Sequence, residues 1–320
     1  GGLLCVGILL FRPEGGPGFM LSEALTMKKI DFGPYNFSLA ELTFWVMAIN
    51  GAFYALQKYG TDQTIVQRYL TAKDDKSAKK AAYIGVFMSL PVWTLFMLLG
   101  SLLFVFYSTG GAVLPGGMMA DEVFPYFIGT QLPVGAVGLV LSALVAAAFS
   151  SLDSDLNGMA AIGVSDFYER FKPQCTDRQK LNLGRWLIFI SGVAMIFVAL
   201  LYVAWDGEGV LGVIFELYAI FSAGLVGIFA LGLFSKRANK QGLYVGLGAC
   251  IAFTAYAVLT TTEINDKLIL DFGKYNFPHH RYMLGVYSHI IVFVVGYFAS
   301  FFFKSKEVAK ELTIYGYLNK

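Results

Sequence analysis

Apolar runs of about 20 residues recur along this chain, which is the length that a helix needs to cross a bilayer. Only 14% of the residues are charged and 57% are hydrophobic, whereas soluble domains carry about 25% charged residues. This pattern predicts an all-α, multi-pass membrane protein, because helices satisfy their own backbone hydrogen bonds in lipid. We expect seven complete spans and the end of another, at residues 42–60, 83–107, 131–152, 184–204, 209–234, 242–261, 283–303 and 1–11.

The basic residues indicate how these spans are oriented. One set of alternate loops plus the C-terminal tail holds 17 of the Lys and Arg residues, and the other set holds 6. Cytoplasmic loops carry the excess of positive charge, so the richer side and the C-terminus are predicted to be cytoplasmic in the cell membrane. The basic residues therefore read as topology signals, and we expect no nucleic-acid partner.

Two long loops, residues 12–41 and 108–130, fall on the outer side in this topology. Loops of this length tend to be functional or disordered. They either cap an external vestibule or connect the spans passively. The three Cys residues lack the spacing of metal ligands, and Cys5 and Cys250 lie in apolar runs as expected of core residues.

A polar stretch, residues 147–157 (AAFSSLDSDLN), interrupts the end of one predicted span. Ser150 and Ser154 share a helix face, and Ala147 lies one turn before Ser150 and Ser151. Polar groups at membrane depth usually mark an ion or solute path, and hydroxyl and carbonyl oxygens suit a hard cation such as Na⁺. The alternative is that the serines hydrogen-bond to carbonyls one turn earlier.

A second unusual segment is span 42–60, which holds polar side chains near its end. The helix has places to unwind at Asn50-Gly51 and at Tyr59-Gly60, and a broken helix is tolerated only where it lines a cavity. Lys58 is costly at membrane depth. The alternative is that the Lys58 side chain extends so that its ammonium group reaches the cytoplasmic interface while its aliphatic part stays in the membrane.

Three motifs in order resemble the sodium/solute symporter family, the group of the sodium/glucose cotransporters. Residues 60–73 (GTDQTIVQRYLTAK) are similar to its "TDQ…VQR.L.AK" segment. Residues 150–157 (SSLDSDLN), followed by DFY at 166–168, resemble its "SSL.S..N" helix and "D.Y". Residues 229–239 (FALGLFSKRAN) resemble its "FLLG.FWKR.N" helix end.

The resemblance implies the leucine-transporter fold, which has two inverted five-helix repeats. The runs match core helices five to ten and two trailing helices, so core helices one to four are absent. The chain starts within an apolar run at Gly1, without a Met or a signal peptide. We expect residues 1–320 to be one partial transmembrane domain, a C-terminal fragment; the alternative is a trimmed chain.

The resemblance also implies a sodium site. Its ligands would be the backbone carbonyl of Ala147 and the hydroxyls of Ser150 and Ser151, with further carbonyls from the absent first core helix. Asp153 and Ser154 match positions that hold a second sodium ion in some members of the family.

The solute positions depart from the sugar pattern of this family. Lys58 stands where sugar transporters carry a gating Tyr, with Tyr59 next to it, and Glu216 adjoins the position of a family Gln. The alternative for Lys58 is an ion pair with Glu216 or another carboxylate. The solute is expected to be a sugar, a polyol or a small organic anion.

The sequence thus predicts sodium-coupled symport by alternating access, with a small solute and membrane lipid as partners, and no enzymatic activity. Two alternatives stay open. A transporter-like membrane sensor would carry a cytoplasmic signalling domain. A proton-pumping membrane subunit would need Lys, Glu or His at membrane depth in several helices.

Overall fold

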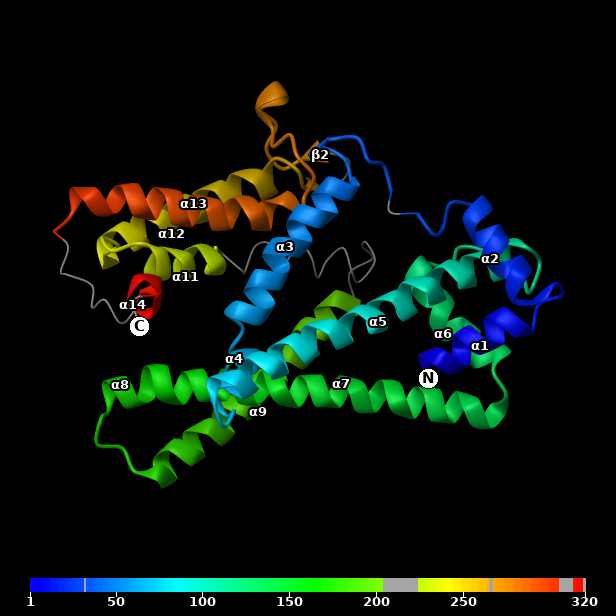
Figure 1. Ribbon diagram of the computed structural model, residues 1–320, viewed down its shortest axis with the longest axis horizontal. Coiled ribbons are helices and arrows are strands. Elements are labelled where there is room, and N and C mark those ends of the chain that lie inside the picture. Colours follow the sequence, from blue (N-terminus) through cyan, green and yellow to red (C-terminus); the bar gives the residue numbers. More distant parts are fainter. Residues whose placement is uncertain (32, 204–223, 265–266, 305–312, 319–320) are drawn as a thin grey trace. The chain divides into compact units, whose positions relative to one another are not determined.

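The computed structural model describes residues 1–31, 33–203, 224–264, 267–304 and 313–318 (Figure 1). The chain divides into two compact units, each described by itself. The first comprises Gly1–Asp31 and Gln67–Gly209, and the second comprises Phe32–Val66 and Val210–Lys320. A short helix, α4 (Gln63–Leu70), crosses the boundary between them.

The first unit consists of helices. They are α1 (Gly2–Phe11), α2 (Gly16–Thr26), α5 (Asp75–Ser108), α6 (Ala120–Gln131), α7 (Val134–Ile162), the π-helix η1 (Gly163–Tyr168), α8 (Glu169–Phe171) and α9 (Asp177–Val203). In this unit α1 and α2 pack against α5, and α9 packs against α7 and η1 (Figure 1).

The core of the first unit lies between α1, α2, α5 and α6. Leu9, Met20, Leu102, Phe106 and Phe127 are buried there, and the rings of Phe106 and Phe127 meet edge to face at 5.8 Å. Thus α2 and α6 are packed helices within the two segments that we predicted as long outer loops. Both are short and contain Gly or Pro, so their apolar faces give little periodic signal.

The second unit is built around α13. Its elements are α3 (Phe44–Gly60), α11 (Leu225–Phe234), α12 (Lys240–Leu259), the antiparallel strands β1 (Glu263–Ile264) and β2 (Lys267–Leu268), the 3₁₀-helix η2 (Gly273–Tyr275), α13 (Met283–Ala299), the 3₁₀-helix η3 (Ser300–Phe302) and α14 (Ile314–Leu318). Helices α3, α11 and α12 all pack against α13, and Figure 1 shows α11 and α12 beside it.

Small residues bring α12 and α13 close together, as is common in membrane helices. A Cβ atom added at Gly246 would lie 2.8 Å from the carbonyl oxygen of Val292. Further along the same contact, the hydroxyls of Thr254 and Ser288 are 3.3 Å apart and buried. These contacts hold α12 against α13.

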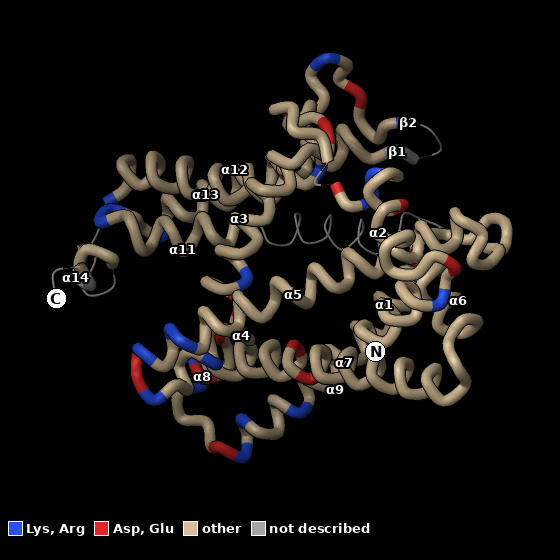
Figure 2. Tube along the Cα trace, turned by 45° about the vertical axis from the view of Figure 1, so that its right-hand side comes forward, with Lys and Arg blue, Asp and Glu red and all other residues tan. Residues whose placement is uncertain are grey.

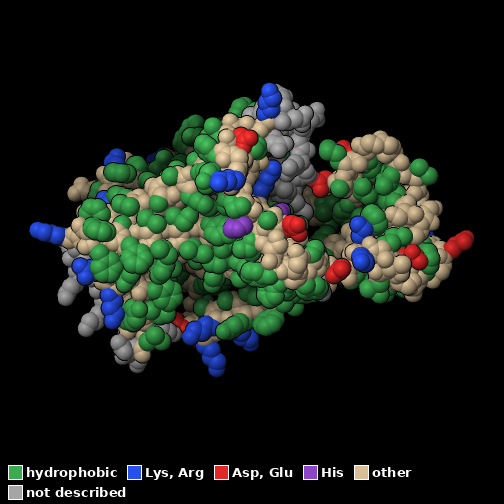
Figure 3. Space-filling model, turned by 90° about the horizontal axis from the view of Figure 1, so that it is seen from above, with side chains coloured by type: hydrophobic (Ala, Val, Ile, Leu, Met, Phe, Trp, Pro, Cys, Tyr) green, Lys and Arg blue, Asp and Glu red, His purple; other side chains and the backbone are tan. Residues whose placement is uncertain are grey.

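Five described helical segments are long and apolar enough to cross a membrane: Asp75–Ser108, Val134–Phe171, Asp177–Val203, Lys240–Leu259 and Met283–Phe302. Apolar side chains cover much of the face seen in Figure 3. In the first unit, Lys and Arg gather at the start of α5 and at the turn between α8 and α9, with long uncharged stretches along the helices (Figure 2). The prediction of a multi-pass membrane protein is confirmed.

The helices extend beyond several predicted spans. α5 begins at Asp75, where the Asp74 carboxylate accepts the Ser77 N–H at 2.7 Å, and α7 continues to Ile162. These additions are polar helical ends that continue past the apolar run. The helix α3 is unbroken through Asn50-Gly51 and ends at Gly60, so the predicted unwinding at Asn50-Gly51 is wrong. Most of the predicted span 209–234 lies outside the described residues.

Cysteine and histidine occupy structural positions. Cys5 and Cys250 are buried, as predicted. His279 Nδ1 lies 2.6 Å from the hydroxyl of Tyr287. Within the described parts of the chain, no group of three or more His, Cys, Asp or Glu residues is placed to hold a metal ion.

Candidate functional site

Helix α7 carries the polar stretch that the sequence singled out. It begins directly after Pro133, within the predicted span 131–152, and continues unbroken through residues 147–157 to Ile162. Several residues in the first half of the helix are alanines with short side chains. Nearly all of the helix surface is free of contacts with other described residues. The polar groups of α7 are therefore displayed along one continuous helix rather than in a loop.

Three of the predicted sodium ligands lie within one turn of α7. Ala147, Ser150 and Ser151 are spaced i, i+3 and i+4, so their oxygens face the same side. All three residues are exposed. Among the residues that the structure describes, neither the Ser150 nor the Ser151 hydroxyl makes a hydrogen bond. Both hydroxyls have lone pairs free to contact a cation.

The two candidates for a second ion lie one turn further along α7. The Ser154 hydroxyl donates to the carbonyl oxygen of Ser150 at 3.1 Å, which is the back-bonding that the sequence left as an alternative. The Asn157 side-chain amide donates to the Asp153 carboxylate at 2.9 Å and to its carbonyl at 2.8 Å. These bonds fix both side chains, and each retains an oxygen lone pair because a hydroxyl and a carboxylate accept several contacts.

The chain leaves this site through a π-helix, η1. Gly163 opens it, and a Cβ atom there would lie 2.6 Å from Leu187 Cδ1 of α9, so the absence of a side chain permits this close approach. π-helical turns occur often at functional sites. No periodic pattern of residues predicted this change of helix type.

The predicted solute residues Lys58 and Tyr59 form the last turn of α3, in the second unit. Lys58 Nζ lies 2.6 Å from Asp62 Oδ2, and both side chains are partly buried. Of the alternatives left open for Lys58, the structure thus favours an ion pair with a carboxylate other than Glu216. Glu216 lies outside the described residues.

Asp62 has a second role at the start of α4. Its Oδ1 accepts the backbone N–H of Thr64 at 2.9 Å and the Thr64 hydroxyl at 2.6 Å, as capping residues do. Burial raises the pKa of the Asp62 carboxyl, but the hydrogen bonds from Lys58 and Thr64 and the charge of Lys58 outweigh it, and the net shift is downward. Asp62 therefore stays ionised and joins α3 to α4. The i, i+4 spacing of Lys58 and Asp62 was the signal that sequence reasoning missed.

Comparison with known proteins shows which family the chain belongs to. The sequence model of the Sodium:solute symporter family matches residues 20–249. The chain belongs to the sodium:solute symporter family. This membership accounts for the three motifs and for the apolar helices that carry them.

Individual members of the symporter family are similar over most of the chain. The sodium/sialic acid symporter NanT of Aliivibrio fischeri is 30% identical over 316 residues, which cover 97% of this chain and 58% of the relative. The sodium/sialic acid symporter SiaT of Proteus mirabilis is 29% identical over 252 residues, 77% of this chain and 50% of the relative. The chain thus spans about half the length of these relatives.

A solved structure confirms the fold. A Na⁺-coupled sialic acid symporter, solved in a substrate-bound outward-open state that reveals a novel Na⁺ site, matches with a TM-score of 0.81 and 26% identity. The match covers 96% of this chain and 61% of the symporter. The predicted leucine-transporter fold is thereby confirmed for the part of the fold that the chain spans.

Proposed function

We propose that the protein takes part in sodium-coupled symport of a small polar solute by alternating access. The observation that carries this proposal is the pair of hydroxyls at Ser150 and Ser151 on α7, which make no hydrogen bond with any described residue, in a chain of the sodium:solute symporter family. The relatives named above are sodium-coupled symporters. No enzymatic step is needed for this activity.

Sodium would bind at the Ala147 carbonyl and at the hydroxyls of Ser150 and Ser151. A desolvated cation needs more oxygens than one helical turn supplies, so a second helix would have to contribute the others. Sodium binding would stabilise the outward-open state and favour solute binding. Each charge that moves inward gains about 2.3 kcal/mol per 100 mV of membrane potential.

A second sodium ion would use Asp153 and Ser154. The hydrogen bond from Asn157 holds the Asp153 carboxylate on the surface of α7, and the Ser154 hydroxyl is fixed by its bond to the preceding turn. The geometry supports this site less directly than the first, because both side chains already have partners.

The solute would be a sugar, a polyol or a small organic anion, and sialic acid combines a polyol with a carboxylate. The two relatives named for sialic acid favour it as the first solute to test. Lys58, Tyr59 and Glu216 remain our proposed solute residues. An anionic solute that reached Lys58 would compete with Asp62, which already pairs with it.

The protein would act in the cell membrane with its C-terminus in the cytoplasm, as the distribution of Lys and Arg favours. Uptake of labelled sialic acid by membrane vesicles from cells that produce the full-length protein tests the function. We expect an inward Na⁺ gradient to drive uptake several-fold above an equal K⁺ gradient, and above vesicles lacking the protein. Equal uptake in Na⁺ and K⁺ would contradict sodium coupling. Sodium-driven uptake of glucose alone would contradict only the choice of solute.

A further inference from the structure

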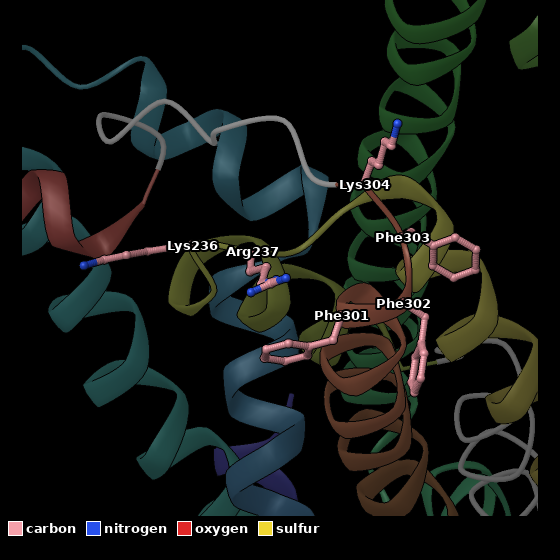
Figure 4. A pocket seen from close by; sticks show the side chains of 6 residues that line it. All are labelled: Lys236, Arg237, Phe301, Phe302, Phe303 and Lys304. Carbon is pink, nitrogen blue, oxygen red and sulfur yellow. The ribbon is translucent and has the colours of Figure 1, made fainter.

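A basic cavity lies where α11 turns into α12 and where the chain leaves η3. It has a volume of about 670 Å³ and is lined by Lys236, Arg237, Phe301, Phe302, Phe303 and Lys304. Figure 4 shows the Arg237 guanidinium beside the Phe301 ring, while the side chains of Lys236 and Lys304 extend away from it in different directions. Lys236 Nζ lies over the Tyr315 ring, 4.3 Å from its centroid. Lys236 and Arg237 belong to the third sequence motif, to which the proposed symport assigns no role.

Hydrogen bonds fix the turn that presents the two motif cations. The Ser235 hydroxyl oxygen accepts the backbone N–H groups of Arg237 at 3.1 Å and of Ala238 at 2.9 Å. The Asn239 side chain then donates to the Ser300 carbonyl at 2.9 Å, which ties the turn to η3. The basic residues and the aromatic residues are therefore held together by hydrogen bonds between side chains and the backbone, although they are far apart in the sequence.

In the part of the chain that the structure describes, the three cations of the cavity have no acidic partner. Within the described ranges, Lys236, Arg237 and Lys304 form no salt bridge, and no carboxylate lines the cavity. The Arg237 guanidinium lies over the Phe301 ring, 4.6 Å from its centroid. Stacking occupies the face of the guanidinium and leaves its in-plane N–H donors free for an anion.

The cavity also lies at the end of apolar helices. α11 contains only apolar residues and glycine up to Phe234, and the membrane-crossing segment of α13 ends at Phe302. Phe302 is 86% exposed and Phe303 is 39% exposed. Lys and Arg side chains at the end of a membrane-crossing helix are typical of the level of the lipid headgroups.

We propose that this cavity binds the phosphate headgroup of an anionic phospholipid, such as phosphatidylglycerol. Arg237 would contact the phosphate through its free N–H groups, and the exposed side chains of Lys236 and Lys304 would turn toward it when the lipid binds. The acyl chains would run along the apolar surface beside Phe302. Basic pockets between helices at the cytoplasmic face have this chemistry, and the charge-based topology places the cavity on that face. The proposal stands apart from the proposed symport.

Native mass spectrometry of the full chain in detergent tests this site, with an equimolar mixture of phosphatidylglycerol and phosphatidylcholine as the probe. The site variant combines Lys236→Gln, Arg237→Gln and Lys304→Gln. The matched control combines Lys76→Gln, Lys172→Gln and Arg178→Gln, which are exposed and remove the same charge from the same predicted side. We expect phosphatidylglycerol to be retained in preference to phosphatidylcholine, and its Kd to rise at least about tenfold in the site variant only.

Three results would overturn the proposal. They are equal retention of phosphatidylglycerol by the site and control variants, equal retention of the two lipids by the unmodified chain, and full displacement of the lipid by excess inorganic phosphate. The last result would indicate a site for a free anion. Arg237→Gln alone repeats the comparison with one exposed side chain changed, so that a folding defect of the triple variant does not decide the outcome.

Discussion

Lys58 Nζ lies 2.6 Å from Asp62 Oδ2, so an ion pair joins the last turn of α3 to the start of α4. Both residues belong to segments that stood out in the sequence, Lys58 for its cost at membrane depth and Asp62 for its place in the first family motif. The ion pair offsets the cost of placing Lys58 at membrane depth, because the Asp62 carboxylate neutralises the lysine charge. It also fixes the corner at which α3 ends.

Breaking this ion pair should destabilise the protein modestly. Partly exposed pairs at i, i+4 contribute about 0.5 kcal/mol, and we expect that coupling free energy from Lys58→Gln, Asp62→Asn and the double variant. Thermal unfolding in detergent, followed by circular dichroism, measures it. Strictly additive effects of the two substitutions would show that the ion pair contributes nothing.

The contribution of Asp62 should depend on pH in a defined direction. Its pKa is lowered in the folded protein, so its stabilising effect is present above the unfolded pKa and is lost as the pH falls through the folded pKa. The difference in stability between the unmodified protein and Asp62→Asn should therefore be constant near neutral pH and shrink below about pH 4. Melting temperatures of both proteins across this range test it; a difference that grows on acidification is the opposite outcome.

The predicted topology can be tested with single cysteines. Ser77→Cys and Val113→Cys place thiols at exposed positions, 87% exposed for Val113, in a Cys175→Ser background where the other cysteines are buried. Val113 suits this test better than the nearby Gly111, because a Cβ atom at Gly111 would lie 2.8 Å from the Phe106 carbonyl oxygen. An impermeant maleimide should label Ser77→Cys only from the cytoplasm and Val113→Cys only from outside. Reversed labelling would invert the orientation.

The contact between α12 and α13 should tolerate no side chain at Gly246. Gly246→Ala would place its Cβ 2.8 Å from the Val292 carbonyl oxygen, and overpacking of this kind costs about 1–3 kcal/mol. A Cβ at Gly248 of the same helix meets nothing within 4 Å, so Gly248→Ala should be neutral or stabilising through helix propensity. Melting temperatures in detergent compare the two. Equal values would show that α12 and α13 do not pack closely at Gly246.

Long, apolar elements were predicted well from the sequence. The apolar runs located α5, α9, α12 and α13, and the span predicted at residues 131–152 contains the start of α7 at Val134. The helices α2 and α6 were missed because they are short and their apolar residues pack against α5, a contact that no local pattern reveals. The single membrane domain over residues 1–320 stays a prediction.

In the candidate site, too, local relations could be predicted from the sequence and contacts between distant residues could not. Helical spacing sufficed to place Ala147, Ser150 and Ser151 on one face of α7, since that relation is local. The basic cavity was not predicted, because it depends on the hydrogen bond that ties Asn239 to Ser300 and so brings together residues far apart in the chain.

Removing one proposed sodium ligand tests the central claim most directly. The measurement is the Na⁺ concentration for half-maximal solute uptake by the full-length protein with Ser151→Ala. Ser142→Ala, which changes an exposed serine earlier on α7, is the control. Loss of one oxygen ligand should cost about 1–3 kcal/mol and so raise this concentration at least about fivefold in Ser151→Ala. The control should match the unmodified protein. An unchanged sodium dependence in Ser151→Ala at normal protein levels would contradict the sodium site on α7.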